Sequence, residues 1–156
     1  LVFGDPQALA DLRKIALTSS AGVPERIAAL EALIEKRVAD LAVDLHDLLK
    51  DQSPRRVGLR GLAALPHDAT PDRVLAVYTK LLPEEKQDAV ATLASRKEYA
   101  LRLLQAVEEK TIPRTDVSAY VARQLYAMTQ AQGYGRKDFS AVMKMLGGFA
   151  EDKGSQ

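Results

Sequence analysis

Three short stretches of the chain share one pattern, and they decide the fold: PERIAALEAL at residues 24–33, PRRVGLRGL at 54–62 and PEEKQDAVATL at 83–93. Each stretch opens with a proline, and within it a small residue precedes an aliphatic one, with a second small residue two or three positions later. The three prolines and Pro113 are separated by 30, 29 and 30 residues. Small residues at this spacing allow neighbouring helices to approach closely. The pattern therefore predicts a repeated element in which a proline marks the start of the second helix of a pair.

Apolar residues recur with helical spacing along nearly the whole chain, and no stretch alternates for long enough to require a strand. A two-helix element of about 30 residues cannot bury both of its faces alone, so such elements stack into a solenoid. We therefore expect an all-α fold, a right-handed α–α superhelix of about four helix pairs followed by a C-terminal helix that contains Phe139. The pairs begin near Asp5, Arg37, His67 and Arg96. An irregular helical bundle is the alternative.

The boundaries of the chain suggest one domain cut from a longer protein. We expect residues 1–150 to form a single helical-repeat domain and residues 151–156 to form a polar tail. The first residue is Leu1 rather than methionine, and no basic segment followed by an apolar run stands near it. No apolar stretch approaches the roughly 18–20 residues that cross a bilayer, so the sequence predicts no membrane span.

Composition excludes several classes of function. The 156 residues include 22 lysines and arginines and 21 aspartates and glutamates, which leaves a net charge of +1. Such a chain has no overall field that would hold it on nucleic acid or on an anionic membrane, so any such binding needs a local patch. The chain also has no cysteine. It therefore lacks a thiolate nucleophile, a cysteine-ligated metal and a thioether attachment point for haem.

The remaining residues with catalytic or metal-binding chemistry do not form a recognisable site. His46 and His67 are the only imidazoles, and their spacing is typical of neither a metal site nor a catalytic pair. Asp40, Asp44 and Asp47 share one helix face and could gather a divalent cation, but a solvated acidic face is the favoured interpretation. We expect a protein that is not an enzyme, with no catalytic, metal-binding or cofactor-binding residue in this stretch.

The arginine–alanine–leucine pattern after each proline resembles HEAT repeats. A more specific resemblance covers about 45 residues, which include Leu-Ala-Ser-Arg at 93–96 and Ile-Pro-Arg at 112–114. This part is similar to the HEAT-like segment of large planctomycete and verrucomicrobial proteins, which join a membrane-bound dehydrogenase-like module, HEAT-like repeats and a c-type cytochrome module. The resemblance implies a periplasmic or exported helical spacer between redox modules, whose partners are flanking domains or another protein. Without cysteine, no haem-binding residue carries over to this chain.

Three arginines form the one local basic cluster, Arg55, Arg56 and Arg60. The last two are four residues apart and share a helix face, where they could bind phosphates or carboxylates of a partner. Second helices line the concave surface of HEAT-like arrays, so the cluster is the candidate partner-binding site of a scaffold. A nucleic-acid-binding HEAT-like module is the alternative function. Glu31 and Glu35 of the preceding pair could neutralise the cluster by surface pairing.

Overall fold

The computed structural model describes residues 5–132, and within them the chain forms helices and turns without a β-strand. The all-α prediction is confirmed for this part of the chain. The predicted last helix, with Phe139, lies outside the described residues. The chain divides into two compact units, Leu1–Asp88 and Ala89–Gln156. Within the described range, no helix combines the length and the apolar character that crossing a bilayer requires.

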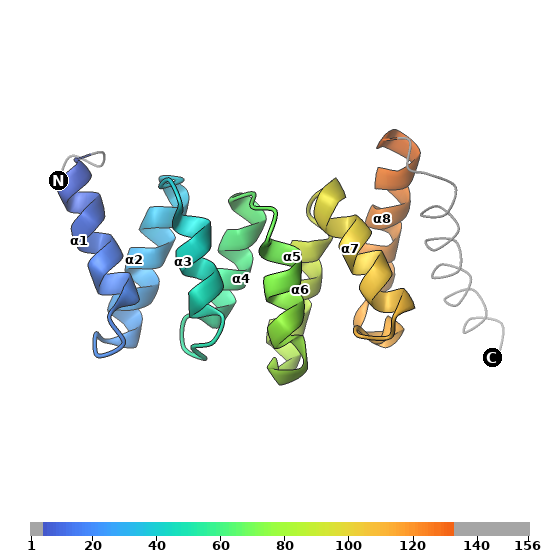
Figure 1. The fold of residues 1–156 in the computed structure, drawn as a ribbon, viewed down its shortest axis with the longest axis horizontal. Helices are drawn as coiled ribbons and strands as arrows, with labels where there is room; N and C mark the ends of the chain where they lie inside the picture. The colour runs from blue at the N-terminus through green and yellow to red at the C-terminus, as the bar shows by residue number, and fades with distance from the viewer. Residues whose placement is uncertain (1–4, 133–156) are drawn as a thin grey trace. The chain divides into compact units, whose positions relative to one another are not determined.

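The first unit consists of consecutive antiparallel helix pairs (Figure 1). Its elements are α1 (Pro6–Leu17), α2 (Val23–Glu35), α3 (Leu41–Leu48), α4 (Arg55–Ala64), α5 (Thr70–Val77), the 3-10 turn η1 (Tyr78–Lys80) and the beginning of α6 (Pro83–Leu93). Helix α1 packs on α2, and α3 packs on α4. Between pairs, α2 contacts α4 and α3 contacts α5. Like helices therefore stack on like helices, with odd-numbered helices in one row and even-numbered helices in the other.

The second helices of the first three pairs begin where the proline spacing predicts. Pro24 occupies the first turn of α2, Pro54 caps α4, and Pro83 is the first residue of α6. Proline suits these positions because its missing N–H would have no partner inside the helix. Pro113 departs from the pattern, because it precedes a 3-10 turn and the next helix begins only at Ala119.

Leucines fill the interior of the first unit, and one glycine sets how closely its helices approach. The fully buried side chains include Leu30, Leu33, Leu45, Leu59 and Leu62. A Cβ on Gly61 would lie 2.5 Å from Ile34 Cδ1 and 3.0 Å from Leu45 Cδ1. The ends of the Ile34 and Leu45 side chains therefore occupy the space that a side chain at position 61 would need.

An arginine in the first turn of α2 connects this helix to the end of α1 and to the turn between α3 and α4. Arg26 is 4% exposed. A buried arginine usually needs polar partners, and Arg26 has two. Its Nε donates a hydrogen bond to the Ala16 carbonyl at the end of α1, at 3.1 Å. Its Nη1 lies 2.8 Å from Asp51 Oδ2, in the turn between α3 and α4. One guanidinium thus satisfies a helix end in its own pair and binds a carboxylate of the next pair.

The same arrangement recurs 29 residues later, at Arg55 in the first turn of α4. Its Nε donates to the Leu49 carbonyl at the end of α3, at 2.7 Å, and its Nη1 lies 3.0 Å from Glu85 Oε2 in α6. Glu85 Oε2 also accepts the Leu82 N–H at 2.7 Å. We call each arginine, with its carbonyl and its carboxylate, an arginine clip. The two clips link three successive helix pairs through equivalent contacts.

The second unit is described up to residue 132. It contains the end of α6, then α7 (Lys97–Glu108), the 3-10 turn η2 (Arg114–Asp116) and α8 (Ala119–Gln132). Its buried side chains include Tyr99, Leu103, Ile112, Val117 and Leu125. Lys110, just after α7, has a φ of 63° in the left-handed region. The next residue, Thr111, donates its N–H to the Ala106 carbonyl at 2.9 Å. This closure satisfies a carbonyl at the helix end, as left-handed C-terminal caps do.

Candidate interaction groove

The predicted arginine cluster does not form one free basic patch. Arg55 is held in its clip, and its side chain is 11% exposed. Arg56 Nε donates a hydrogen bond to Asp88 Oδ2 in α6, at 2.8 Å, and this hydrogen bond, followed by the charge of the carboxylate, raises the pKa of Arg56. Arg60 Nε donates to the Arg56 carbonyl of its own helix, at 3.3 Å. Two of the three guanidinium groups therefore already bind carboxylates of the following helix pair.

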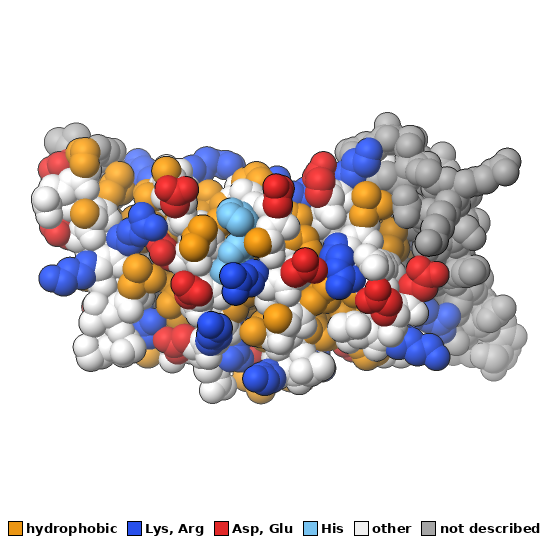
Figure 2. All heavy atoms as spheres, in the orientation of Figure 1, with side chains coloured by type: hydrophobic (Ala, Val, Ile, Leu, Met, Phe, Trp, Pro, Cys, Tyr) orange, Lys and Arg blue, Asp and Glu red, His pale blue; other side chains and the backbone are white. Residues whose placement is uncertain are grey.

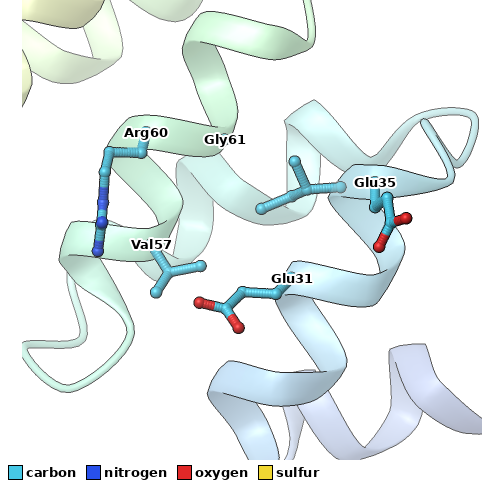
Figure 3. A pocket seen from close by; sticks show the side chains of 6 residues that line it. Glu31, Glu35, Val57, Arg60 and Gly61 are labelled. Atoms are coloured by element: carbon cyan, nitrogen blue, oxygen red, sulfur yellow. The ribbon is translucent and has the colours of Figure 1, made fainter.

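The third arginine borders a groove between α2 and α4. The groove is a pocket of about 270 Å³, lined by Glu31, Ile34 and Glu35 from α2 and by Val57, Arg60 and Gly61 from α4. Figure 3 shows Glu31 reaching from α2 toward Val57, while Arg60 lies on the far side of the valine. The floor is apolar, and charged side chains of opposite sign stand on the two walls.

The two glutamates on the α2 wall do not neutralise the arginine on the α4 wall. Glu31 and Glu35 are one helical turn apart and exposed. Among the residues that the structure describes, neither carboxylate forms a salt bridge, and Arg60 forms none either. The pairing that the sequence suggested is therefore absent from this structure. Within residues 5–132, the result is an apolar groove whose charged rim side chains form no ion pair.

The fold brings the two histidines together, which their spacing did not indicate. His46 of α3 is buried, and its Nε2 lies 2.8 Å from Thr70 Oγ1 at the start of α5. The two imidazole rings meet edge to face with centroids 5.0 Å apart, and they appear pale blue in Figure 2. His67 Nδ1 accepts the Ala69 N–H at 3.1 Å. His67 lies in the turn between α4 and α5, so the pair forms only when this turn packs beside α3, and the spacing of the two residues along the chain does not reveal it.

Neither the histidine pair nor the acidic helix face assembles a metal site. Within the described residues, no group of three or more histidines, aspartates and glutamates is placed to hold an ion. Asp40 precedes α3 with a left-handed φ of 61°, so only Asp44 and Asp47 of the three lie on the helix. Asp44 binds Arg13 of α1, with Nη2 2.6 Å from Oδ2. This ion pair connects the odd-numbered helices of the first two pairs.

We expect the stability of the first unit to fall as the pH drops below about 6.5, the ordinary pKa of His46. Burial lowers this pKa, the charges of His67 and Arg73 lower it further, and Asp47 opposes them weakly. The unfolded chain therefore takes up the proton before the folded chain does. The stability that depends on neutral His46 is fully present above pH 6.5 and is lost as the pH falls through the lowered pKa of the folded state.

The measurement is the free energy of unfolding in urea at pH 7.5 and at pH 5.5. His46→Gln should reduce the difference between the two values, because glutamine keeps a polar group beside Thr70 but does not titrate. An unchanged difference in this variant would show that other groups cause the pH dependence.

Comparison of the chain with models of protein families, with curated proteins and with solved structures gave no match. The resemblance to HEAT-like segments of dehydrogenase and cytochrome proteins therefore stays a prediction. Its redox context and its exported location rest on the residues quoted for it. No residue role is transferred from a relative.

Proposed function

We propose that the chain is a non-catalytic HEAT-like α-solenoid, which serves as a scaffold or spacer and offers a protein-interaction surface on its even-numbered helices. The recurrence of the arginine clip carries this proposal. Arg26 and Arg55 make the same kinds of contact, 29 residues apart, each to a carbonyl of its own pair and to a carboxylate of the next. Contacts that repeat with the sequence period are expected of stacked repeats rather than of an irregular bundle.

The mechanism of such a scaffold is geometric. Each clip fixes one helix pair against the next. The stacked pairs would then hold the domains that flank them in the sequence at a fixed separation. The interaction surface is the groove between α2 and α4, because its apolar floor and unpaired rim charges are available. Flanking domains of a larger exported redox protein are the partners that the resemblance implies.

The nucleic-acid alternative draws no support from the arginine geometry. Arg55 and Arg56 are engaged by Glu85 and Asp88, and such carboxylates compete with phosphates for the guanidinium groups. Arg60 remains, but it shares its groove with two glutamates that repel phosphates. We therefore favour a polypeptide partner.

An in-register deletion tests the solenoid. Removing residues 26–54, one period of 29, places Arg55 directly after Glu25, where Arg26 normally stands. We expect the shortened chain to fold cooperatively, because Arg55 can then reach the Ala16 carbonyl and still bind Glu85. Spin labels on cysteines introduced at Gln7 and Thr79, both exposed, should move closer by about 10 Å, the spacing of neighbouring packed helices.

A shorter deletion serves as the matched control. Removing residues 26–40 joins the first turn of α2 to α3, which places an odd-numbered helix in the even-numbered row. This variant should lose cooperative unfolding, as followed by circular dichroism in urea. If the 29-residue deletion also abolishes the transition, the first unit is an indivisible bundle and the solenoid proposal is wrong.

A further inference from the structure

The charges around the groove differ from the other charges that connect successive helix pairs. Four arginines of the first unit bind an acidic residue that follows 25 to 32 positions later: Arg13 with Asp44, Arg26 with Asp51, Arg55 with Glu85 and Arg56 with Asp88. Glu31 and Arg60 are 29 positions apart and lie on the contacting helices α2 and α4. Yet they form no ion pair in the described part of the chain. Here the opposite charges stand on either side of an apolar floor.

The dimensions of the groove suit side chains better than a cofactor. Its volume of about 270 Å³ lies below the roughly 300–1,000 Å³ of pockets that hold small molecules. Val57 and Ile34 provide an aliphatic floor, and Gly61 contributes no side chain that would fill it. An aliphatic side chain from another polypeptide can therefore lie between the two helices and be shielded from water.

We propose that the groove docks a segment of a partner polypeptide in which an aliphatic side chain lies between a basic and an acidic residue. The ammonium or guanidinium group of the basic residue binds Glu31 and Glu35, and the partner's carboxylate binds Arg60. This assignment rests on the proposed scaffold function, and it specifies the chemistry of the partner.

Charge and shape together select this ligand. Two carboxylates stand on the α2 wall and favour a cation, and they disfavour phosphate or a wholly acidic segment. The methylene stem of lysine or arginine can cover apolar floor while its charged end reaches the rim. A basic segment without an acidic residue would leave Arg60 without a carboxylate to bind. Only a segment with both charges pairs every rim group.

A small set of fluorescein-labelled peptides provides the probe. In each peptide, lysine and aspartate flank one leucine, with separations of one to three residues on either side, because partner backbones can present the charges at different spacings. We expect at least one peptide to bind saturably in a fluorescence anisotropy titration. Replacing its leucine by serine should weaken binding about tenfold or more, since the aliphatic floor then loses its ligand.

Variants of the protein then locate the binding. The double change Glu31→Gln and Glu35→Gln should weaken the best peptide about tenfold, and Arg60→Gln should weaken it several-fold. Arg56→Gln is the matched control, because this arginine lies one turn away on the same helix and binds Asp88 instead of lining the groove. It should leave the affinity unchanged. Arg60→Glu should be rescued by a peptide whose aspartate is replaced by lysine.

Several results would overturn the inference. One is that no peptide binds the folded wild-type chain; another is that binding survives the double glutamate change. Methyl NMR signals of Ile34 and Val57 that stay unshifted on saturation would place the peptide elsewhere. Salt-sensitive binding of duplex DNA that Arg60→Gln weakens and the glutamate changes do not would favour the nucleic-acid alternative. None of these measurements uses the 29-residue deletion, so the scaffold and its ligand are tested separately.

Discussion

Replacing Glu85 by alanine is expected to lower the free energy of unfolding by about 3–5 kcal/mol, the usual cost of breaking a buried ion pair from one side. The Glu85 side chain is 3% exposed, and its Oε2 accepts hydrogen bonds from Arg55 Nη1 at 3.0 Å and from the Leu82 N–H at 2.7 Å. The change leaves a desolvated guanidinium without its counter-charge. It also leaves the Leu82 N–H without its acceptor.

Urea unfolding followed by circular dichroism measures this loss of stability, and two further variants show whether the buried charge causes it. The double change Arg55→Met with Glu85→Met should recover a large part of the stability, because no unpaired charge is then buried. Asp88→Ala removes the carboxylate that binds the half-exposed Arg56, and we expect it to have little effect. If Glu85→Ala and Asp88→Ala lose equal stability, the clip of Arg55 is not desolvated in solution.

Gly61→Val is expected to destabilise the first unit by about 1–3 kcal/mol, the usual cost of overpacking a core. A Cβ at this position would lie 2.5 Å from Ile34 Cδ1 and 3.0 Å from Leu45 Cδ1, so these side chains, or α4 itself, must shift. The valine side chain would also occupy part of the groove. Thermal unfolding measures the first effect, and peptide anisotropy measures the second.

Gly58→Ala, one turn earlier on the same helix, is the matched control. Its Cβ would meet only ordinary contacts, 3.8 Å from the Leu45 carbonyl oxygen and from Leu49 Cδ2. Alanine is the better helix former by roughly 0.5–1 kcal/mol, so this change should stabilise the chain. Opposite signs at the two glycines would confirm that close helix contact is confined to position 61. Destabilisation at both would mean that the whole face of α4 is closely packed.

Local rules predicted the helices of the first unit well. Pro24, Pro54 and Pro83 mark helix starts because the proline ring fixes φ and removes an N–H that has no partner there. Leu30 and Leu33 stand three positions apart in the first quoted stretch, which places them on one helix face, and both are buried. These features depend on residues within one or two turns of each other, which is the range that a sequence pattern reports directly.

The partners of charged side chains could not be predicted in the same way. Arg55 was predicted to belong to a surface cluster, but its side chain is mostly buried and binds Glu85, 30 residues later. Glu31 was expected to help neutralise the cluster that includes Arg60, and the two side chains stand apart across Val57. Which cation meets which anion depends on the packing of separate helices, which the period alone does not specify. The arginine that follows the proline of each of the first two stretches, Arg26 and Arg55, was the one available signal of the clips.

The clips also make the stack extendable. The segment from residue 26 to residue 54 contains an arginine at its beginning and Asp51 near its end, so it carries both halves of a clip. In a tandem copy of residues 26–54, the copied arginine would find the copied Asp51 at the same spacing. Arg55 would still follow the second copy directly and could bind Glu85 as before. Gene duplication could therefore lengthen such a chain by a whole helix pair while keeping the clip contacts, because each copy contains both an arginine and its carboxylate.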